Sequence, residues 1–456
     1  MILFVLAACT GAHSDQGNTL VPGPAPSETG TPPTSVVPTG DTGATTEGKP
    51  VVASCALDPD HPLRVLCEAT LHAAGSATLE LSAADAGTRT FVSEELLVDH
   101  EILGWGLQAD TTYDWAIDDA FGTVTTGPIP QLLADADITV TGTPNGFDAA
   151  LTVLTCNGQR FFTMIEGDGD IVWFHRDDVW GSNWQGYDWS QADRSLLTQS
   201  SSTLVETGVG GAELLRITGT SFSGSLHHDV ARWNQYTYSI FSRSTNVNVD
   251  GIFVFEGTKL LGEFFLGDHY DTTGGFGDWS HANGLNATED GQLIFSLLNF
   301  DAVLSIDGDP ASPKFLQINW LAAGNPPSDL PNPDYVAVAG PLEGFSGQHN
   351  PHVVGDKLWV FDNAGVGGGS RALRTTLDAK AGTITHDASW NLGVTCPIQS
   401  GAVPLEGGGV LASCQSNGRA AAFEEGNPSA VWSLDADCGG PGFGVRPNRV
   451  IPILIE

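Results

Sequence analysis

The sequence predicts an all-β protein with a small β-sandwich at residues 51–130 and a larger β-propeller at residues 131–456. The chain has 456 residues, more than a single hydrophobic core usually holds, so we expect at least two domains. It contains 56 glycines and 26 prolines and lacks the long Ala, Leu, Glu and Lys runs of helical proteins. Short apolar runs instead recur between Gly, Asp and Pro turns, which is typical of short strands.

The charge of the chain excludes one class of partner. Lys and Arg total 18 against 54 Asp and Glu, for a net charge of −36. This charge repels the phosphates of nucleic acids and anionic lipid surfaces, so we expect no nucleic-acid partner. No apolar run reaches the ~20 residues that a membrane helix needs. We therefore expect a folded protein that does not span a membrane. The N-terminal residues suggest that it contacts one only through a lipid anchor.

The first fifty residues suggest export and anchoring. An apolar stretch ends in Leu6-Ala7-Ala8 before Cys9, which resembles a bacterial lipoprotein signal over residues 1–8 with Cys9 as the lipidated residue. Residues 9–50 are rich in Pro, Thr and Gly and are predicted to be a disordered tether. We expect an exported protein anchored in the bacterial cell envelope, in the periplasm or at the outer membrane. The alternative for this segment is an ordinary frayed N-terminus.

The remaining six cysteines suggest disulfides. An even number of cysteines in an exported protein is typical of a disulfide framework, although six cysteines allow 15 pairings. Neighbouring strands favour one pairing over the others. It joins Cys55 to Cys67, Cys396 to Cys414, and Cys156 to Cys438 at the two ends of the large domain.

Residues 51–130 predict a small sandwich. They contain seven short alternating runs separated by Gly, Asp and Pro, the pattern of a β-sandwich. Leu107 is followed six residues later by Tyr113, which resembles the tyrosine corner of fibronectin-type and immunoglobulin-like sandwiches. We interpret this domain as a structural or positioning module.

Residues 131–456 predict a propeller. Turns that lead into short apolar strands recur at residues 289–295, 355–360 and 406–411. At a period of ~40–55 residues, the segment holds six to eight blades, and we favour six. The alternative is a double-sheet β-sandwich, which would not explain the repeats. The Gly-Asp-Gly-Asp segment at 167–170 lacks the twelfth-position Glu of a calcium loop and is interpreted as a blade turn.

Histidines recur in register with these blades. Three polar segments carry them: SLHHD at 225–229, DWSHAN at 278–283 and GQHNPH at 347–352. His228, His281 and His349 are 53 and 68 residues apart, about one blade plus an insertion each time. Residues at the same position in successive blades converge on the central channel, so we expect the three rings to meet at one mouth. The alternative is that each histidine caps a turn or bonds a neighbouring blade.

The same segments carry a family resemblance. HHD, DWSHANGLN with the following GQLIFSLLNFDAVLSID, and GQHNPHVVGDKLWVFDNAG resemble conserved blocks of bacterial arylsulfate sulfotransferases. The resemblance covers about residues 51–456 and implies an exported six-bladed propeller after a small β-sandwich. It implies sulfuryl transfer from an aryl sulfate donor to a phenol acceptor, without a nucleotide donor, a cofactor or a metal.

The resemblance also assigns roles to residues. His349 corresponds to the nucleophile that takes the sulfuryl group, His281 to a second catalytic histidine and His228 to a third, with His227 as the alternative or a substrate-binding residue. Sulfuryl transfer spreads negative charge over the sulfonate oxygens, so it needs positioned donors and cations. Imidazoles can attack, donate and accept protons near neutral pH. The resemblance therefore predicts a sulfohistidine intermediate and ping-pong kinetics.

The sequence departs from the family at one position. The family carries an arginine eighteen residues after the second histidine, where this chain has Asn299. Asn299 can bind a substrate oxygen but has no charge, which should weaken anion binding. Three arginines in polar, Gly-rich segments could compensate: Arg371, Arg374 and Arg446.

Two other functions fit the same residues. His227, His228, Asp229, His281 and His349 could bind zinc, copper or iron, although their spacing lacks a short metal-ligand signature. A lipid-tethered binding propeller with a decayed site is the other alternative, and Asn299 is its best argument.

Overall fold

The computed structural model describes these residues: 51–176, 186–244, 247–273, 275, 277–325, 330–338, 344–364, 369–438 and 449–455. The predicted signal, Cys9 and the tether at residues 9–50 lie outside the described residues. Gly48–Glu456 forms one compact unit. Within the described part of the chain, no helix has the length and apolarity to cross a membrane.

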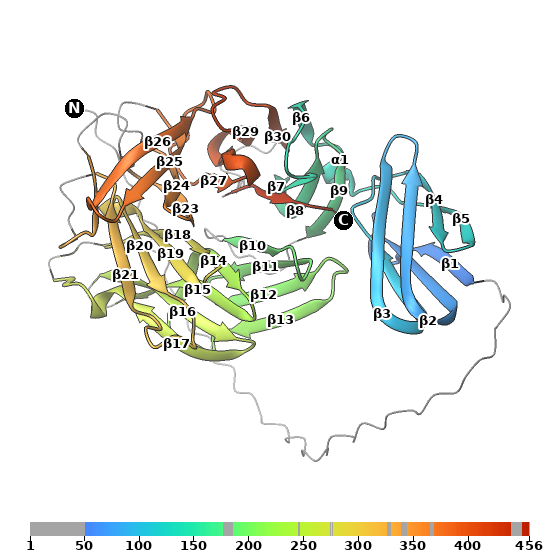
Figure 1. The fold of residues 1–456 in the computed structure, drawn as a ribbon, viewed down its shortest axis with the longest axis horizontal. Coiled ribbons are helices and arrows are strands. Elements are labelled where there is room, and N and C mark those ends of the chain that lie inside the picture. Colours follow the sequence, from blue (N-terminus) through green and yellow to red (C-terminus); the bar gives the residue numbers. More distant parts are fainter. Residues whose placement is uncertain are drawn as a thin grey trace, which may run out of the picture. The chain divides into compact units, whose positions relative to one another are not determined.

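The first domain is a five-stranded antiparallel sheet with β3 and β4 both paired to β2. The seven predicted runs fall on five strands, because four of them merge in pairs into the long strands β2 and β3 (blue in Figure 1). The backbone N–H of Gln108 donates to the Tyr113 hydroxyl over 3.0 Å, a contact of the tyrosine-corner kind. The strands are β1 (Val52–Leu57), β2 (Val65–Ala83), β3 (Gly87–Gly104), β4 (Thr112–Ile117) and β5 (Ala120–Thr125).

The second domain is a six-bladed β-propeller of four-stranded antiparallel units, as the sequence predicted (Figure 1). A short helix, α1 (Gln131–Ala134), precedes it. Blade 1 contains β31 (Ile451–Ile453), β7 (Ala149–Cys156), β8 (Gln159–Glu166) and β9 (Ile171–Arg176). Blade 2 contains β10 (Tyr187–Ser190), β11 (Ser195–Ser200), β12 (Thr203–Gly208) and β13 (Glu213–Thr218), and blade 3 contains β14 (Ser225–Trp233), β15 (Tyr236–Ser244), β16 (Asn248–Glu256) and β17 (Lys259–Phe265).

Blades 4 to 6 complete the ring. Blade 4 contains β18 (Ala282–Ala287), β19 (Gln292–Leu297), β20 (Ala302–Asp307) and β21 (Ile318–Ala323), and blade 5 contains β23 (His349–Val354), β24 (Lys357–Asp362), β25 (Arg371–Asp378) and β26 (Thr383–Trp390). Between them, β22 (Tyr335–Ala337) runs parallel to β21 and β26 and joins the two blades into one sheet. Blade 6 contains β27 (Gly401–Pro404), β28 (Val410–Cys414), β29 (Arg419–Phe423), β30 (Trp432–Asp437) and an added strand, β6 (Asp137–Gly142). The 3₁₀ turns are η1 (Leu266–Asp268), η2 (Leu298–Phe300), η3 (Glu406–Gly408) and η4 (Gln415–Asn417).

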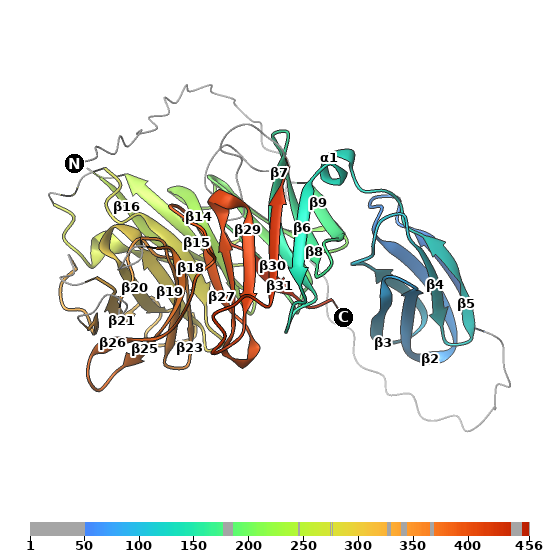
Figure 2. The ribbon, with the colours of Figure 1, turned by 90° about the horizontal axis from the view of Figure 1, so that it is seen from above.

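Hydrophobic clusters connect each blade to the next around the ring. Six buried clusters join blades 1–2, 2–3, 3–4, 4–5, 5–6 and 6–1. Successive side chains of a strand point to opposite faces of its sheet. Alternate residues of one strand therefore pack against the preceding blade and against the following blade. In β19, Leu293 and Phe295 pack toward blade 3 while Ile294 packs toward blade 5. This closed order rules out the double-sheet alternative. Figure 2 shows the propeller from the side, with strands β30 and β6 of blade 6 next to β31 and β7 of blade 1.

Both ends of the propeller sequence help to close the ring. The C-terminal strand β31 supplies the inner strand of blade 1, and the early strand β6 adds to the outer edge of blade 6. The Cys156–Cys438 disulfide links β7 to the residue after β30 across 282 residues. Cys55–Cys67 and Cys396–Cys414 are also bonded, so the predicted pairing is confirmed.

The predicted turns occupy their expected places. The segments at 289–295, 355–360 and 406–411 each lead into the second strand of a blade, namely β19, β24 and β28. Residues 167–170 form the turn between β8 and β9, with Gly169 at φ 103°.

Candidate active site

The inner strands of the blades begin around one pocket. Strands β10, β14, β18, β23 and β27 lie toward the centre of the ring (Figure 1). The pocket has about 340 Å³ of empty space, its opening included. Every blade contributes a residue from the first half of its inner strand or from the two residues before it, as follows: Tyr187, His228, Asn283, His349, Gln399 and Arg449. The repeated blade position therefore brings distant polar residues together.

The backbone is irregular where these strands reach the pocket. Pairing with the second strand of the blade shifts register within β14, β18 and β23. His228, His281 and Asn350 have φ values of 58°, 47° and 47°. Residues other than glycine rarely adopt this left-handed conformation, and such strain gathers at functional sites. The bulges direct side chains toward the mouth of the pocket. In a regular strand the same side chains would point elsewhere.

His349 is a buried, neutral imidazole in which one ring nitrogen, Nδ1, is already hydrogen-bonded. Its Nδ1 lies 2.8 Å from Asn363 Oδ1 and 3.2 Å from the Gly347 carbonyl oxygen. Both partners are acceptors, so Nδ1 carries the proton and Nε2 keeps its lone pair. Burial is the main cause that lowers the pKa of His349 to about 4, although the hydrogen bond to Asn363 opposes it. The ring is therefore neutral and nucleophilic at pH 7.

His228 belongs to a chain of polar groups that starts at a buried carboxylate. His227 Nε2 lies 3.0 Å from Asp250 Oδ1, and His227 Nδ1 lies 2.6 Å from His228 Nδ1. Where His227 donates to Asp250 through Nε2 and accepts from His228 through Nδ1, the lone pair of His228 is left on Nε2. Burial, followed by the neighbouring histidines, lowers the pKa of His228 well below its ordinary value. His228 is thus neutral and able to accept a proton.

His281 has the opposite electrostatic surroundings. Its Nδ1 lies 2.7 Å from Asp278 Oδ2, and its ring centroid is 5.0 Å from that of His228. Burial opposes the charged form as the largest single influence, but the hydrogen bond and charge of Asp278, with the charge of Asp250, raise the pKa of His281. His281 is the histidine of the site that favours its cationic form.

Asn299 supports the loop that carries His281. It is exposed on η2, and its Nδ2 donates to the Asp278 carbonyl oxygen over 2.7 Å. The backbone N–H of Leu298 donates to the His281 carbonyl oxygen over 3.2 Å. The side chain expected to bind substrate is thus engaged with the backbone beside the carboxylate partner of His281.

Two of the candidate compensating arginines are committed elsewhere. Arg371 Nε pairs with Asp362 at 3.0 Å. Arg374 pairs with Asp387 and lies over the Trp359 ring, 5.1 Å from its centroid. Neither lines the pocket. Arg446 lies outside the described residues.

A different arginine reaches the pocket. Arg449 is 3% exposed just before β31, and its guanidinium lies 3.3 Å from Asp229 and 3.6 Å from Asp188. It also donates to the Tyr187 carbonyl oxygen. Two carboxylates compensate this charge, so Arg449 joins the inner strands of blades 1, 2 and 3 more than it supplies a free cation.

Several buried amide atoms at the pocket have no partner in the described structure. The Asn350 Oδ1 accepts from the Ala402 backbone N–H over 3.2 Å, which leaves its Nδ2 unpartnered. Both polar side-chain atoms of Gln399, Oε1 and Nε2, are unpartnered. Asn283 Oδ1 is also unpartnered, while Asn283 Nδ2 donates to the Gln348 carbonyl oxygen. Leaving buried polar groups unpaired is costly, so such groups point to a ligand or water in the pocket.

The structure thus gathers the four predicted histidines and adds residues that the sequence analysis missed. Asp278 stands three positions before His281 and could have been suspected from that spacing. Asn363 lies within the third segment of the family resemblance, fourteen residues after His349, but the sequence analysis did not single it out. Asp250 lies on β16, two strands away from His227 on β14, and has no local signal. Among the described residues, no group of three or more His, Cys, Asp or Glu side chains is arranged to hold a metal ion.

Comparisons with known proteins concern the fold. No protein-family model and no curated protein matches the chain. A Bacteroides caccae protein of unknown function aligns at 14% identity and TM-score 0.44, over 67% of this chain and 99% of that chain. A putative 6-phosphogluconolactonase from Bacteroides fragilis aligns at 13% and 0.38, over 83% and 98%. A catalytically inactive virginiamycin B lyase from Staphylococcus aureus with quinupristin aligns at 13% and 0.37, over 64% and 86%.

Proposed function

We propose that the protein transfers a sulfuryl group from a phenolic sulfate ester to a phenol through a sulfohistidine at His349. One observation carries the proposal above the others. His349 is buried and neutral, and its Nδ1 is held by two acceptors, so that Nε2 retains a lone pair at a pocket shared with His228. This is the state that a nucleophilic imidazole requires.

In the first step, His349 Nε2 forms a bond to sulfur while the bond between sulfur and the aryl oxygen breaks. The electron pair of that bond leaves on the phenolate oxygen. The cationic His281 supplies a proton to this oxygen, which its pairing with Asp278 supports. The products of the step are a free phenol and an N-sulfonated His349.

In the second step, an acceptor phenol attacks the sulfur of the sulfohistidine. His228 Nε2 takes the phenol proton, and the bond between sulfur and nitrogen breaks with its electron pair returning to His349. The proton then passes from His228 to solvent, and His281 regains a proton from solvent. The chain from Asp250 through His227 orients His228 for this transfer.

Neutral amides are the groups that we assign to the sulfonate oxygens. Asn350 Nδ2 and Gln399 Nε2 are buried, unpartnered donors at the pocket. The charge that spreads over these oxygens in the transition state is stabilised by fixed donors in a dry site. Together with cationic His281, these donors supply what the family's arginine would supply at the position of Asn299.

Export to the cell envelope is part of the proposal. The lipoprotein-like pattern at Cys9 supports it, and so do the three disulfides, which persist in oxidising compartments. The proposed substrates are small phenolic molecules and their sulfate esters.

The test is nitrophenolate release from 4-nitrophenyl sulfate, with and without phenol and without any nucleotide donor. We expect phenol-dependent release, ping-pong kinetics and a sulfonated peptide containing His349. His349→Ala should lower the rate by about 1,000-fold or more, whereas His72→Ala, an exposed position in the first domain, should not change it. Equal release by folded His349→Ala protein would contradict the proposal.

A binding propeller without catalysis is the second candidate. It is favoured by Asn299, which places an uncharged residue where the related family carries arginine. Folded wild-type protein that binds 4-nitrophenyl sulfate in calorimetry, but releases no nitrophenolate with any phenol tested, would support this alternative.

A further inference from the structure

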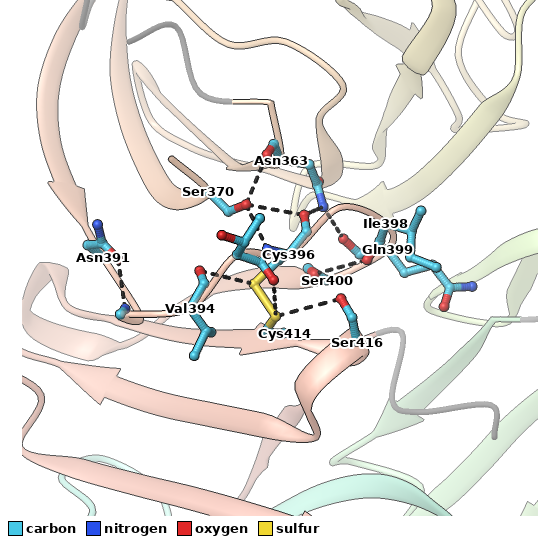
Figure 3. The surroundings of a disulfide bond; sticks show 12 residues. Asn363, Ser370, Asn391, Val394, Cys396, Ile398, Gln399, Ser400, Cys414 and Ser416 are labelled. Carbon is cyan, nitrogen blue, oxygen red and sulfur yellow. Dashed lines mark hydrogen bonds between the residues drawn. A yellow bond between two sulfur atoms is a disulfide. The ribbon is translucent and has the colours of Figure 1, made fainter. Parts of the chain in front are cut away.

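Polar contacts connect Asn363, the partner of His349, to the segment that carries the Cys396–Cys414 disulfide; Figure 3 shows Asn363 and this segment. Asn363 follows β24 and accepts from His349 through Oδ1. Its Nδ2 donates to the carbonyl oxygens of Cys396 and Gln399 over 2.8 and 2.7 Å. Because Nδ2 faces two acceptors, the amide cannot be turned around, and Oδ1 must face the imidazole.

Ser370 ties the same groups together. Its hydroxyl donates to the Asn363 carbonyl oxygen over 2.9 Å and accepts from the Cys396 backbone N–H over 2.8 Å. Ser370 and Asn363 are both buried. The backbone position of Cys396 thus determines where the Asn363 amide can bond.

The segment from Cys396 to Ser400 has no regular structure of its own. Gln399 and Ser400 have φ values of 50° and 99°, a strained conformation for residues other than glycine. The Cys396–Cys414 disulfide anchors this segment to β28, and both cysteines are fully buried. Strained backbone of this kind persists only where its surroundings hold it.

We propose that Asn363 is a positioning residue that fixes the tautomer of His349, and that the Cys396–Cys414 disulfide holds the segment that orients Asn363. Its kinetic consequence rests on the proposed sulfuryl transfer, but its effect on the His349 ring does not. The disulfide therefore acts on the site as well as on stability.

The choice of an amide over a carboxylate has a chemical reason. A carboxylate at position 363 would stabilise the imidazolium of His349 and so occupy the lone pair of Nε2 with a proton. It would also face the two carbonyl oxygens without a proton to donate to either. An amide accepts from Nδ1, donates to both carbonyls and leaves the ring uncharged.

The first arm of the test measures the His349 ring directly in the full chain. Histidine ¹⁵N shifts report the tautomer and the pKa, and His349→Gln assigns the signal. We expect wild type to hold its proton on Nδ1, Asn363→Leu to shift toward the Nε2–H tautomer, and Asn363→Asp to raise the pKa from about 4. Retention of the Nδ1–H tautomer in folded Asn363→Leu protein would overturn the proposal.

The second arm removes the disulfide. Cys396→Ser with Cys414→Ser should shift the tautomer and lower kcat by about 10- to 100-fold with little change in KM, as loss of an orienting partner does. Cys55→Ser with Cys67→Ser is the matched control, since the two bonds close loops of similar separation, 18 and 12 residues. They should therefore cost similar stability. The control should leave tautomer and kcat unchanged.

Folding is checked by circular dichroism and thermal unfolding. If the Cys396 and Cys414 variant does not fold, Ser370→Ala tests the same link, with the same expected shift in tautomer. An unchanged tautomer in the folded disulfide variant, or in Ser370→Ala where that variant is needed, would overturn the proposal. Because the ¹⁵N shifts need no substrate, a protein that fails to transfer sulfate but shows these shifts would contradict the proposed function alone.

Discussion

His349 and His281 belong to neighbouring blades and are surrounded by different partners. Around His349 the partners are an amide oxygen and a carbonyl oxygen, and its pKa is lowered to about 4, chiefly by burial. Around His281 burial also opposes charge, but the Asp278 carboxylate outweighs it, and the pKa is raised. The His349 ring is buried, whereas the His281 side chain is 35% exposed and is accompanied by a carboxylate.

This difference shows how neighbouring residues of one type can acquire opposite pKa shifts. Enzymes often separate an acid from a base by giving two similar groups environments that push their pKa values apart. In the proposed reaction, neutral His349 would attack sulfur, and His281, whose pKa is raised, would donate a proton to the departing oxygen.

The largest effect is expected on replacing His228, the base of the proposed second step. His228→Ala should lower transfer to phenol by about 100- to 1,000-fold, because a positioned base contributes about that much. Formation of the sulfohistidine should suffer less, since the first step does not use this base. Rapid-quench measurement of both half-reactions separates the steps, with His72→Ala as the control. Equal losses in both steps would contradict the role given to His228.

Removal of the carboxylate on the His281 side should have the next largest effect. In Asp278→Asn, burial is no longer opposed by that charge, so the pKa of His281 should fall and the ring should be neutral at pH 7. We expect kcat/KM for 4-nitrophenyl sulfate to fall about 10- to 30-fold. The dependence on the leaving-group pKa should steepen across a series of aryl sulfates. An unchanged dependence would argue against proton donation by His281.

The pH profile of kcat/KM should have an acidic limb set by His349 and a basic limb set by His281. His349 has a pKa lowered to about 4, so the activity measured by kcat/KM should be retained above about pH 4 and lost as pH falls through that value. His281 has a raised pKa, so its contribution should be present below the ordinary value of 6.5 and lost as pH rises through the raised value. In Asp278→Asn the basic limb should move to lower pH while the acidic limb stays in place. His227, His228 and Asp250 also face this region, so their variants locate any coupled limb.

Much of the fold could be predicted from the sequence because its signals are local and repeated. Turns before apolar strands mark each blade, and cysteine positions relative to strands favoured the pairing that forms. The merging of runs into β2 and β3 was not predictable, because a bend within a continuous strand and a turn between two strands share the same residues. The added strand β6 on blade 6 likewise depends on which edge is left open when the ring closes.

Some residues of the candidate site could likewise be predicted from the sequence, and others could not. The histidine segments repeat with the blades, so their convergence could be expected from spacing alone. Asp250 reaches His227 from another strand, and Arg449 comes from the far end of the chain, so no local pattern marks them. Asn363 belongs to the same sequence segment as His349, but its contact with the ring depends on the pairing of β23 with β24. The pKa difference between His281 and His349 depends on those neighbours and therefore could not be predicted either.

The smallest effect is expected at Asn299, where the sequence departs from the arylsulfate sulfotransferases that its histidine segments resemble. Asn299→Ala removes one exposed hydrogen bond to the Asp278 carbonyl, so kcat/KM should fall only about threefold, as the net worth of one such bond implies. Asn299→Arg restores the family's residue. If His281 already supplies the positive charge, the arginine should change KM for 4-nitrophenyl sulfate by no more than about threefold, since an exposed charge adds little. A much larger decrease in KM, measured beside wild type at pH 6 and pH 8, would mean that the pocket lacks a cation and that His281 does not provide one.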